Sequence, residues 1–94
     1  MLHFIYTYSE TEHPKRNGHT HKTVRIYRLV SGKPRLVAER TDTFVSEFQL
    51  VMEAMEENKC LPKRAFENNP MGGMRYCYAS MLEDAGIASI YRVT

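Results

Sequence analysis

All four histidines lie within the first 21 residues, and their spacing raises the question of a metal site. In an extended backbone His19 and His21 project to the same side, as two metal ligands would, and His13 could supply a third. A zinc ion usually needs four ligands, so Cys60 and Cys77 would have to approach from the other half of the chain. The spacing matches no zinc-finger pattern, and we therefore expect solvent-exposed histidines and no bound cofactor.

Basic and aromatic residues alternate with apolar ones over residues 23–30. If Val24 and Ile26 face the interior, Arg25 and Tyr27 face outward, because successive strand residues point to opposite faces. Depending on the register, three more residues could join this surface, namely His3, Arg35 and Tyr91. Open sheets that bind single-stranded nucleic acid use rings to stack on bases and cations to contact phosphates. The net charge of only +2 makes nucleic-acid binding the alternative rather than the leading hypothesis.

The polar segment over residues 9–21 contains Pro14 and the turn-forming pair Asn17-Gly18. We expect a flexible, basic and histidine-rich loop here. Lys15 and Arg16 would make it an arm that becomes ordered on a partner.

Three acidic residues, Glu53, Glu56 and Glu57, follow one another closely in a segment with helical periodicity. They could resemble a catalytic carboxylate pair, but such a run is usually a solvated helix face, and it could also bind a basic partner. The pair Gly72-Gly73 could expose backbone N–H groups to an anion, although a tight turn is the simpler interpretation. No nucleophile–base pair is recognisable, so we expect that the protein is not an enzyme.

Hydrophobic periodicity predicts three strands, two helices and a final strand. The strands are expected at Leu2–Tyr8, Thr23–Val30, Arg35–Arg40 and Ile87–Val93. Ser31-Gly32-Lys33-Pro34 is expected as the hairpin turn between the second and third strands, because Gly32 can take a positive φ and Pro34 fits the start of an edge strand. The first helix is expected from Thr43 or Ser46 to about Asn58, and the second over Met71–Ala85. Ser46 and Gln49 have the spacing of a capping box. The apolar stripe of the first helix leaves out Leu50 and consists of Phe44, Phe48, Val51, Met52 and Met55. This order predicts a single α+β domain over residues 1–94, a two-layer sandwich of a mainly antiparallel sheet with both helices on one face.

The composition agrees with a small globular domain, with 43% hydrophobic and 26% charged residues in 94. The sequence has no apolar run of membrane-spanning length and no signal-peptide pattern, and its two cysteines are too few for a disulfide framework. We therefore expect free thiols and a cytoplasmic location. Basic residues concentrate in residues 1–40 and acidic residues in 41–70, so a partner could use either half.

In its size and expected order of elements the chain resembles the small accessory proteins of phages and mobile elements, including some anti-CRISPR inhibitors. The resemblance implies one short sheet with two helices and no active site. We expect a non-enzymatic protein that docks on a macromolecular partner, with a protein as the first expectation, nucleic acid as the alternative and a small enzyme third. The residues expected to bind are Lys15, Arg16, Arg25, Tyr27 and Arg35, or Glu53, Glu56 and Glu57 if the partner is basic.

Overall fold

The structure is a computed structural model that describes residues 1–12, 15, 18–60, 82–83 and 85–94. Within these residues the elements follow the order β1 (Leu2–Glu12), β2 (Thr20–Val30), β3 (Lys33–Asp42), α1 (Glu47–Glu57) and β4 (Ile87–Arg92). They form one sheet with the strand order β3-β2-β1-β4. The β1–β2 and β2–β3 pairs are antiparallel, whereas β4 runs parallel to β1.

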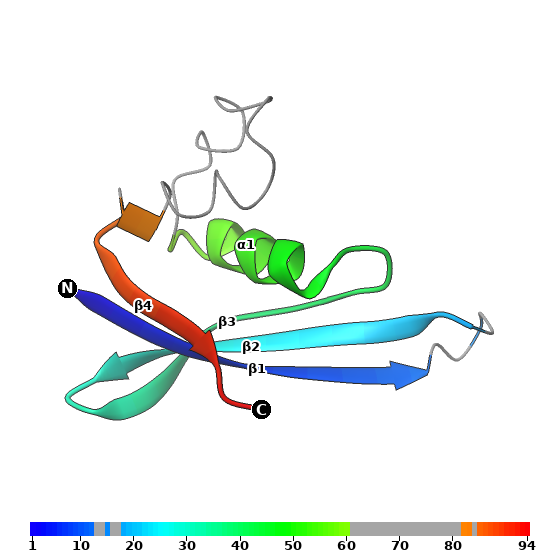
Figure 1. Cartoon of the computed structure of the whole chain (residues 1–94), viewed down its shortest axis with the longest axis horizontal. Coiled ribbons are helices and arrows are strands. Elements are labelled where there is room, and N and C mark those ends of the chain that lie inside the picture. Colours follow the sequence, from blue (N-terminus) through cyan, green and yellow to red (C-terminus); the bar gives the residue numbers. More distant parts are fainter. Residues whose placement is uncertain (13–14, 16–17, 61–81, 84) are drawn as a thin grey trace.

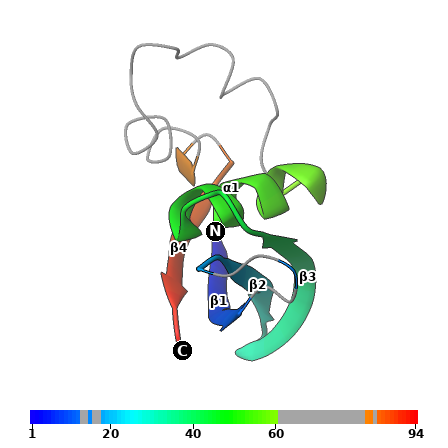
Figure 2. The ribbon, with the colours of Figure 1, turned by 90° about the vertical axis from the view of Figure 1, so that its right-hand side faces the viewer.

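Helix α1 lies across one face of the sheet, and no other described element covers the opposite face (Figures 1 and 2). The fold is therefore a small α+β arrangement of one mixed sheet and one described helix. The predicted sandwich with two helices is not confirmed, because residues 71–81 and 84 of the second predicted helix lie outside the described residues. Among the residues that the structure describes, no helix combines the length and apolar character needed to cross a membrane.

The first two strands are longer than predicted, which corrects the expected loop over residues 9–21. Residues 9–12 belong to β1 and residues 20–21 to β2. Glu10 lies opposite Lys22, and Thr11 lies opposite His21. Opposite charges and β-branched side chains at paired positions stabilise antiparallel strands, so the polar composition of this segment does not prevent pairing.

The predicted hairpin turn between β2 and β3 is present with Gly32 at a positive φ, but it consists of Ser31 and Gly32 alone, because Lys33 and Pro34 belong to β3. Ser31 and Gly32 have φ values of 53° and 77°, and they connect the paired residues Val30 and Lys33. A two-residue turn with positive φ at both positions matches the right-handed twist of the strands it joins. Pro34 lies near the start of β3, which is an edge strand and therefore tolerates a residue without an N–H donor.

The core lies between α1 and the face of the sheet that α1 covers. Val24 and Ile26 of β2 are fully buried, and Phe4 of β1 and Ala38 of β3 are nearly so. From α1 the buried side chains are Leu50, Val51, Met52, Ala54 and Met55. Leu50 is outside the apolar stripe that we predicted for this helix, so the buried surface of α1 is wider than that stripe.

Both ends of α1 are capped by groups that the sequence supplies. The Ser46 hydroxyl accepts a hydrogen bond from the Gln49 N–H at 3.2 Å, as the predicted capping spacing requires. At the other end the Cys60 N–H donates to the Met55 carbonyl at 2.8 Å, and Lys59 has a φ of 61°. These are features of a Schellman motif, in which the residue at positive φ is usually glycine.

Candidate functional site

A row of four apolar or aromatic side chains crosses the uncovered face of the sheet. Tyr27 of β2 is paired with Leu36 of β3 on one side and with Ile5 of β1 on the other. Ile5 is in turn paired with Tyr91 of β4. Paired residues share a face, and Tyr27 follows the buried Ile26, so all four project away from α1. We call these four residues the open-face row.

The ends of the open-face row are accessible to solvent. Leu36 is 51% exposed and Tyr91 is 55% exposed, and each lies on an edge strand. Tyr27 and Ile5, between them, are half-buried by their neighbours in the sheet. A continuous apolar row that spans a whole sheet differs from the isolated exposed hydrophobic residues found on most surfaces, and such surfaces mark interaction sites.

The polar side chains that flank the open-face row are paired with each other. On one side Arg25 Nε lies 2.8 Å from Glu39 Oε2. On the other side His3 Nδ1 and Ser89 Oγ are 2.9 Å apart. The only guanidinium predicted for this surface that lies there, Arg25, is thus neutralised by the carboxylate opposite it.

Arg35, which we expected to contribute to the same surface, lies on the other face. It is paired with Arg28, which neighbours the buried Phe4 on the α1 side of the sheet. The register shift between Ile26 and Tyr27 makes Val37 an extra residue in β3. The prediction that Arg35 lies on the same face as Arg25 is therefore wrong. His3, Tyr27 and Tyr91 do lie on that face.

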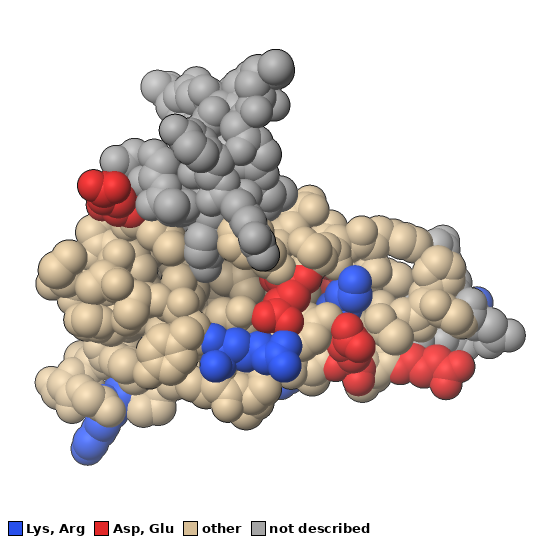
Figure 3. Space-filling model, in the orientation of Figure 1, with Lys and Arg blue, Asp and Glu red and all other residues tan. Residues whose placement is uncertain are grey.

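The predicted arm is described only in part. Lys15 is exposed, and Arg16 lies outside the described residues. Across the face drawn in Figure 3, basic and acidic side chains of the described residues lie interspersed rather than gathered into one basic area. This distribution differs from the basic stripe of typical nucleic-acid-binding domains.

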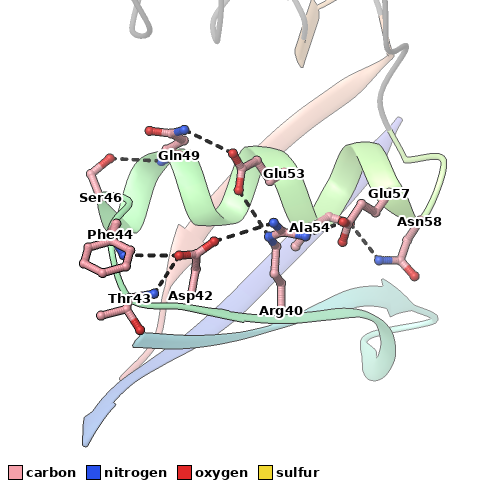
Figure 4. A network of polar contacts seen from close by, with 10 residues as sticks. All are labelled: Arg40, Asp42, Thr43, Phe44, Ser46, Gln49, Glu53, Ala54, Glu57 and Asn58. Atoms are coloured by element: carbon pink, nitrogen blue, oxygen red, sulfur yellow. Dashed lines mark hydrogen bonds and ion pairs between the residues drawn. The ribbon is translucent and has the colours of Figure 1, made fainter. Parts of the chain in front are cut away.

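Arg40 binds two of the three acidic residues predicted to contact a basic partner (Figure 4). Its Nε lies 3.1 Å from Glu53 Oε2, and its Nη1 donates to Glu57 Oε1. Its Nη2 also lies 3.6 Å from Asp42 Oδ2. These contacts join α1 to β3, so Glu53 and Glu57 have a structural role, and Glu56 is the one member of the predicted group outside this network.

The network shifts the pKa values of Asp42 and Arg40. Hydrogen bonds from the Phe44 and Thr43 N–H groups to Asp42, together with the charge of Arg40, lower the pKa of the Asp42 carboxyl. The hydrogen bond to Glu57 is the main cause that raises the pKa of Arg40. Both groups are therefore charged at neutral pH.

A second polar cluster joins β1, α1 and β4. The Tyr6 hydroxyl donates to Glu47 at 2.7 Å, and Arg92 donates to the other oxygen of Glu47 at 2.6 Å. The Arg92 guanidinium lies 5.3 Å from the centre of the Tyr8 ring. Burial, followed by the hydrogen bond to Glu10, raises the pKa of Tyr8 to about 12, so its phenol stays protonated.

The residues considered for metal binding do not form a site within the described part of the chain. No group of three histidine, cysteine or acidic side chains suited to a metal occurs among those residues, and His13 lies outside them. The His19 ring instead packs edge-on against Phe44, with 5.6 Å between the ring centres. Cys60 is a free thiol, and burial raises its pKa. Cys77 and the Gly72-Gly73 turn lie outside the described residues.

A groove of about 1150 Å3 lies on the α1 side of the sheet, between the β2–β3 hairpin and the C-terminal end of α1. Arg28, Arg35 and Lys59 line it, together with several apolar side chains. Our sequence reasoning did not single out Arg28 or Lys59. The Ser31-Gly32 turn contained the signal, because a two-residue turn that pairs Val30 with Lys33 also places Arg28 opposite Arg35.

With the fold and these two surfaces established, we compared the chain with known proteins. No protein-family model, curated protein or solved structure matches it.

Proposed function

We propose that this protein is a non-enzymatic binding protein that docks on a protein partner through the open face of its sheet. The observation that carries the proposal is the open-face row of Leu36, Tyr27, Ile5 and Tyr91. Aromatic residues are enriched at the centres of protein interfaces, where they bury a large area at a small entropic cost.

The electrostatics of this face favour a protein over nucleic acid. Arg25, the cation beside the open-face row, forms an ion pair with Glu39, and Arg35 lies on the other side of the sheet. Nucleic-acid affinity depends strongly on cations that are free to contact phosphates. The partner surface is therefore expected to be largely apolar, with polar groups at its rim.

The alternative, binding of single-stranded nucleic acid, is supported by the two rings of Tyr27 and Tyr91 on one face. Fluorescence anisotropy with labelled DNA and RNA separates the two functions. Phosphate contacts would give an affinity that falls steeply with salt and is lost in the double variant Arg25→Ala/Tyr27→Ala. Under the proposed function no such binding occurs, even at low salt.

Site-specific photo-crosslinking tests the protein partner directly. A photoreactive phenylalanine analogue replaces Tyr27 or Tyr91, and replacement of Phe44, which is 67% exposed away from this face, serves as the matched control. The proposal predicts one crosslinked species from both positions in the source cells and none from the control. Untagged wild type should displace it, whereas Tyr27→Ala/Tyr91→Ala should not. Equal crosslinking from position 44, or crosslinks only between copies of this chain, would overturn the proposal.

A further inference from the structure

The groove between the β2–β3 hairpin and α1 carries cationic groups that the fold does not use. Arg28 and Arg35 are directly opposite each other on β2 and β3, and both line the groove. Neither forms an ion pair with any carboxylate of the described residues, and the same is true of Lys59 at the end of α1. Every other described arginine is paired with an acidic side chain.

This arrangement lowers the stability of the fold rather than raising it. Like charges at directly opposite strand positions repel each other, which makes the Arg28–Arg35 pair unfavourable in the absence of an anion. Lys59 has a positive φ, a backbone conformation that is strained for residues other than glycine. An anion between the two guanidinium groups would relieve the repulsion, and arginine forks bind carboxylates through paired hydrogen bonds.

The groove also offers apolar surface next to the two arginines. Leu2 and Val37 are half-buried there, and Val30 is 43% exposed. Leu36, on the edge strand β3, borders the groove as well, although it belongs to the open-face row. The volume of about 1150 Å3 slightly exceeds the range typical of small-molecule sites, so the groove is large enough for such a ligand. A ligand therefore needs an apolar body as well as an anionic group.

The acidic side chains of the groove limit the charge of the ligand. Glu56 and Glu57 line the wall formed by α1, and only Glu57 is neutralised by Arg40. A polyanion such as nucleic acid would place charges near Glu56. A single anionic group at the arginines, with an uncharged body that extends over the apolar side chains, avoids this repulsion.

We propose that the groove binds an amphipathic organic acid, with its carboxylate between Arg28 and Arg35 and its alkyl or aryl body over Leu2, Val30 and Val37. Arg28 and Arg35 lie on the α1 side of the sheet, and the groove shares only Leu36, at its border, with the open-face row. The proposed site therefore does not depend on the proposed docking function. Lys59, which also lines the groove, adds a third positive charge.

Displacement of a fluorescent probe tests this proposal. Anilinonaphthalene sulfonate, itself an aromatic organic anion, is titrated into the full chain, and decanoate or decyltrimethylammonium is then added as competitor. We expect decanoate to displace the probe and the cation of equal chain length to fail. Arg28→Gln and Arg35→Gln should each weaken decanoate binding about tenfold, as expected for loss of a charge-assisted hydrogen bond. Lys33→Gln, on the same hairpin but outside the groove, is the matched control and should bind as wild type does.

A second measurement uses the wild-type chain and so does not depend on the folding of any variant. Cys60 lines the groove, so bound decanoate should slow its alkylation by N-ethylmaleimide several-fold, measured on the Cys60 peptide by mass spectrometry. Equal effects of decanoate and decyltrimethylammonium, or no protection of Cys60, would overturn the proposal. Tighter displacement by a capped peptide of alternating leucine and glutamate would also overturn it, in favour of a polypeptide ligand.

Discussion

Arg25 and Glu39 lie directly opposite each other on β2 and β3, with 2.8 Å between Nε and Oε2. The turn register alone would place Ala38, not Glu39, opposite Arg25. The extra residue Val37 shifts the pairing by one position, so that Ala38 turns into the core and Glu39 meets Arg25. This single β-bulge thus brings Glu39 to the charge of Arg25 on the open face and places Ala38 in the core.

The Arg25–Glu39 pair should contribute little to stability, because both side chains are about half exposed, at 47% and 48%. A double-mutant cycle with Arg25→Ala and Glu39→Ala is expected to give a coupling free energy of at most about 1 kcal/mol. Urea unfolding at low salt and in 1 M salt measures it. The coupling should vanish at high salt because the pair is exposed to screening; a value that persists there would contradict this account.

The assignment of faces in β2 predicts very different effects for two adjacent residues. Ile26→Ala removes a fully buried side chain and should lower the free energy of unfolding by about 3 kcal/mol. Tyr27→Ala removes a half-buried ring from the uncovered face and should cost about 1 kcal/mol or less. Chemical denaturation followed by circular dichroism checks both. Equal losses would mean that the open-face row belongs to the core.

Much of this fold could be predicted from the sequence by local rules. Alternation identified the buried Val24 and Ile26, Ser46 marked the start of α1, and the Ser31-Gly32 turn identified the β2–β3 hairpin. These features depend on residues that are close together in the chain. The boundaries of β1 and β2 were less predictable, since their polar outer ends are stabilised by pairing with each other.

The candidate sites were harder to predict because they depend on long-range pairing. No local pattern indicates that Ile5 lies between Tyr27 and Tyr91, since β4 reaches β1 only through the parallel pairing of distant segments. Arg40 likewise gathers Glu53 and Glu57 from α1, so a helix flank that appears solvated in the sequence is partly neutralised. Composition cannot show which charges are already paired.

The Arg40 network should make the protein sensitive to acid. Because the pKa of Asp42 is lower in the folded chain, its stabilising effect is present above the unfolded pKa and is lost as the pH falls below about 4. Urea unfolding between pH 7 and pH 2 should show this loss. Asp42→Asn should lower the free energy of unfolding at pH 7 and make its decrease below pH 4 less steep. If the decrease below pH 4 is the same in Asp42→Asn as in wild type, other carboxyl groups cause the acid sensitivity.

Arg40→Met should be more damaging than any of the exposed ion-pair variants. It leaves Asp42, Glu53 and Glu57 close together without a cation, and the Arg40 side chain is only 27% exposed. We expect a loss of about 2 kcal/mol at pH 7, between the values for surface and buried pairs. Adding Glu57→Gln should recover part of it by removing one repelling charge. A double variant no more stable than Arg40→Met would show that this repulsion is absent.

Lys59→Gly should raise stability while it weakens the proposed anion site. Lys59 has a φ of 61° at the end of α1, where glycine avoids the strain of a left-handed conformation. The expected gain is about 0.5–1 kcal/mol in urea unfolding. Lys59→Ala is the matched control, because it removes the charge but keeps the strain, and it should give no gain. If both variants also bind decanoate less tightly than wild type, the Lys59 side chain contributes to ligand binding in the groove rather than to the stability of α1. If Lys59→Ala stabilises the fold as much as Lys59→Gly does, the charge of Lys59, and not backbone strain, is unfavourable at this position.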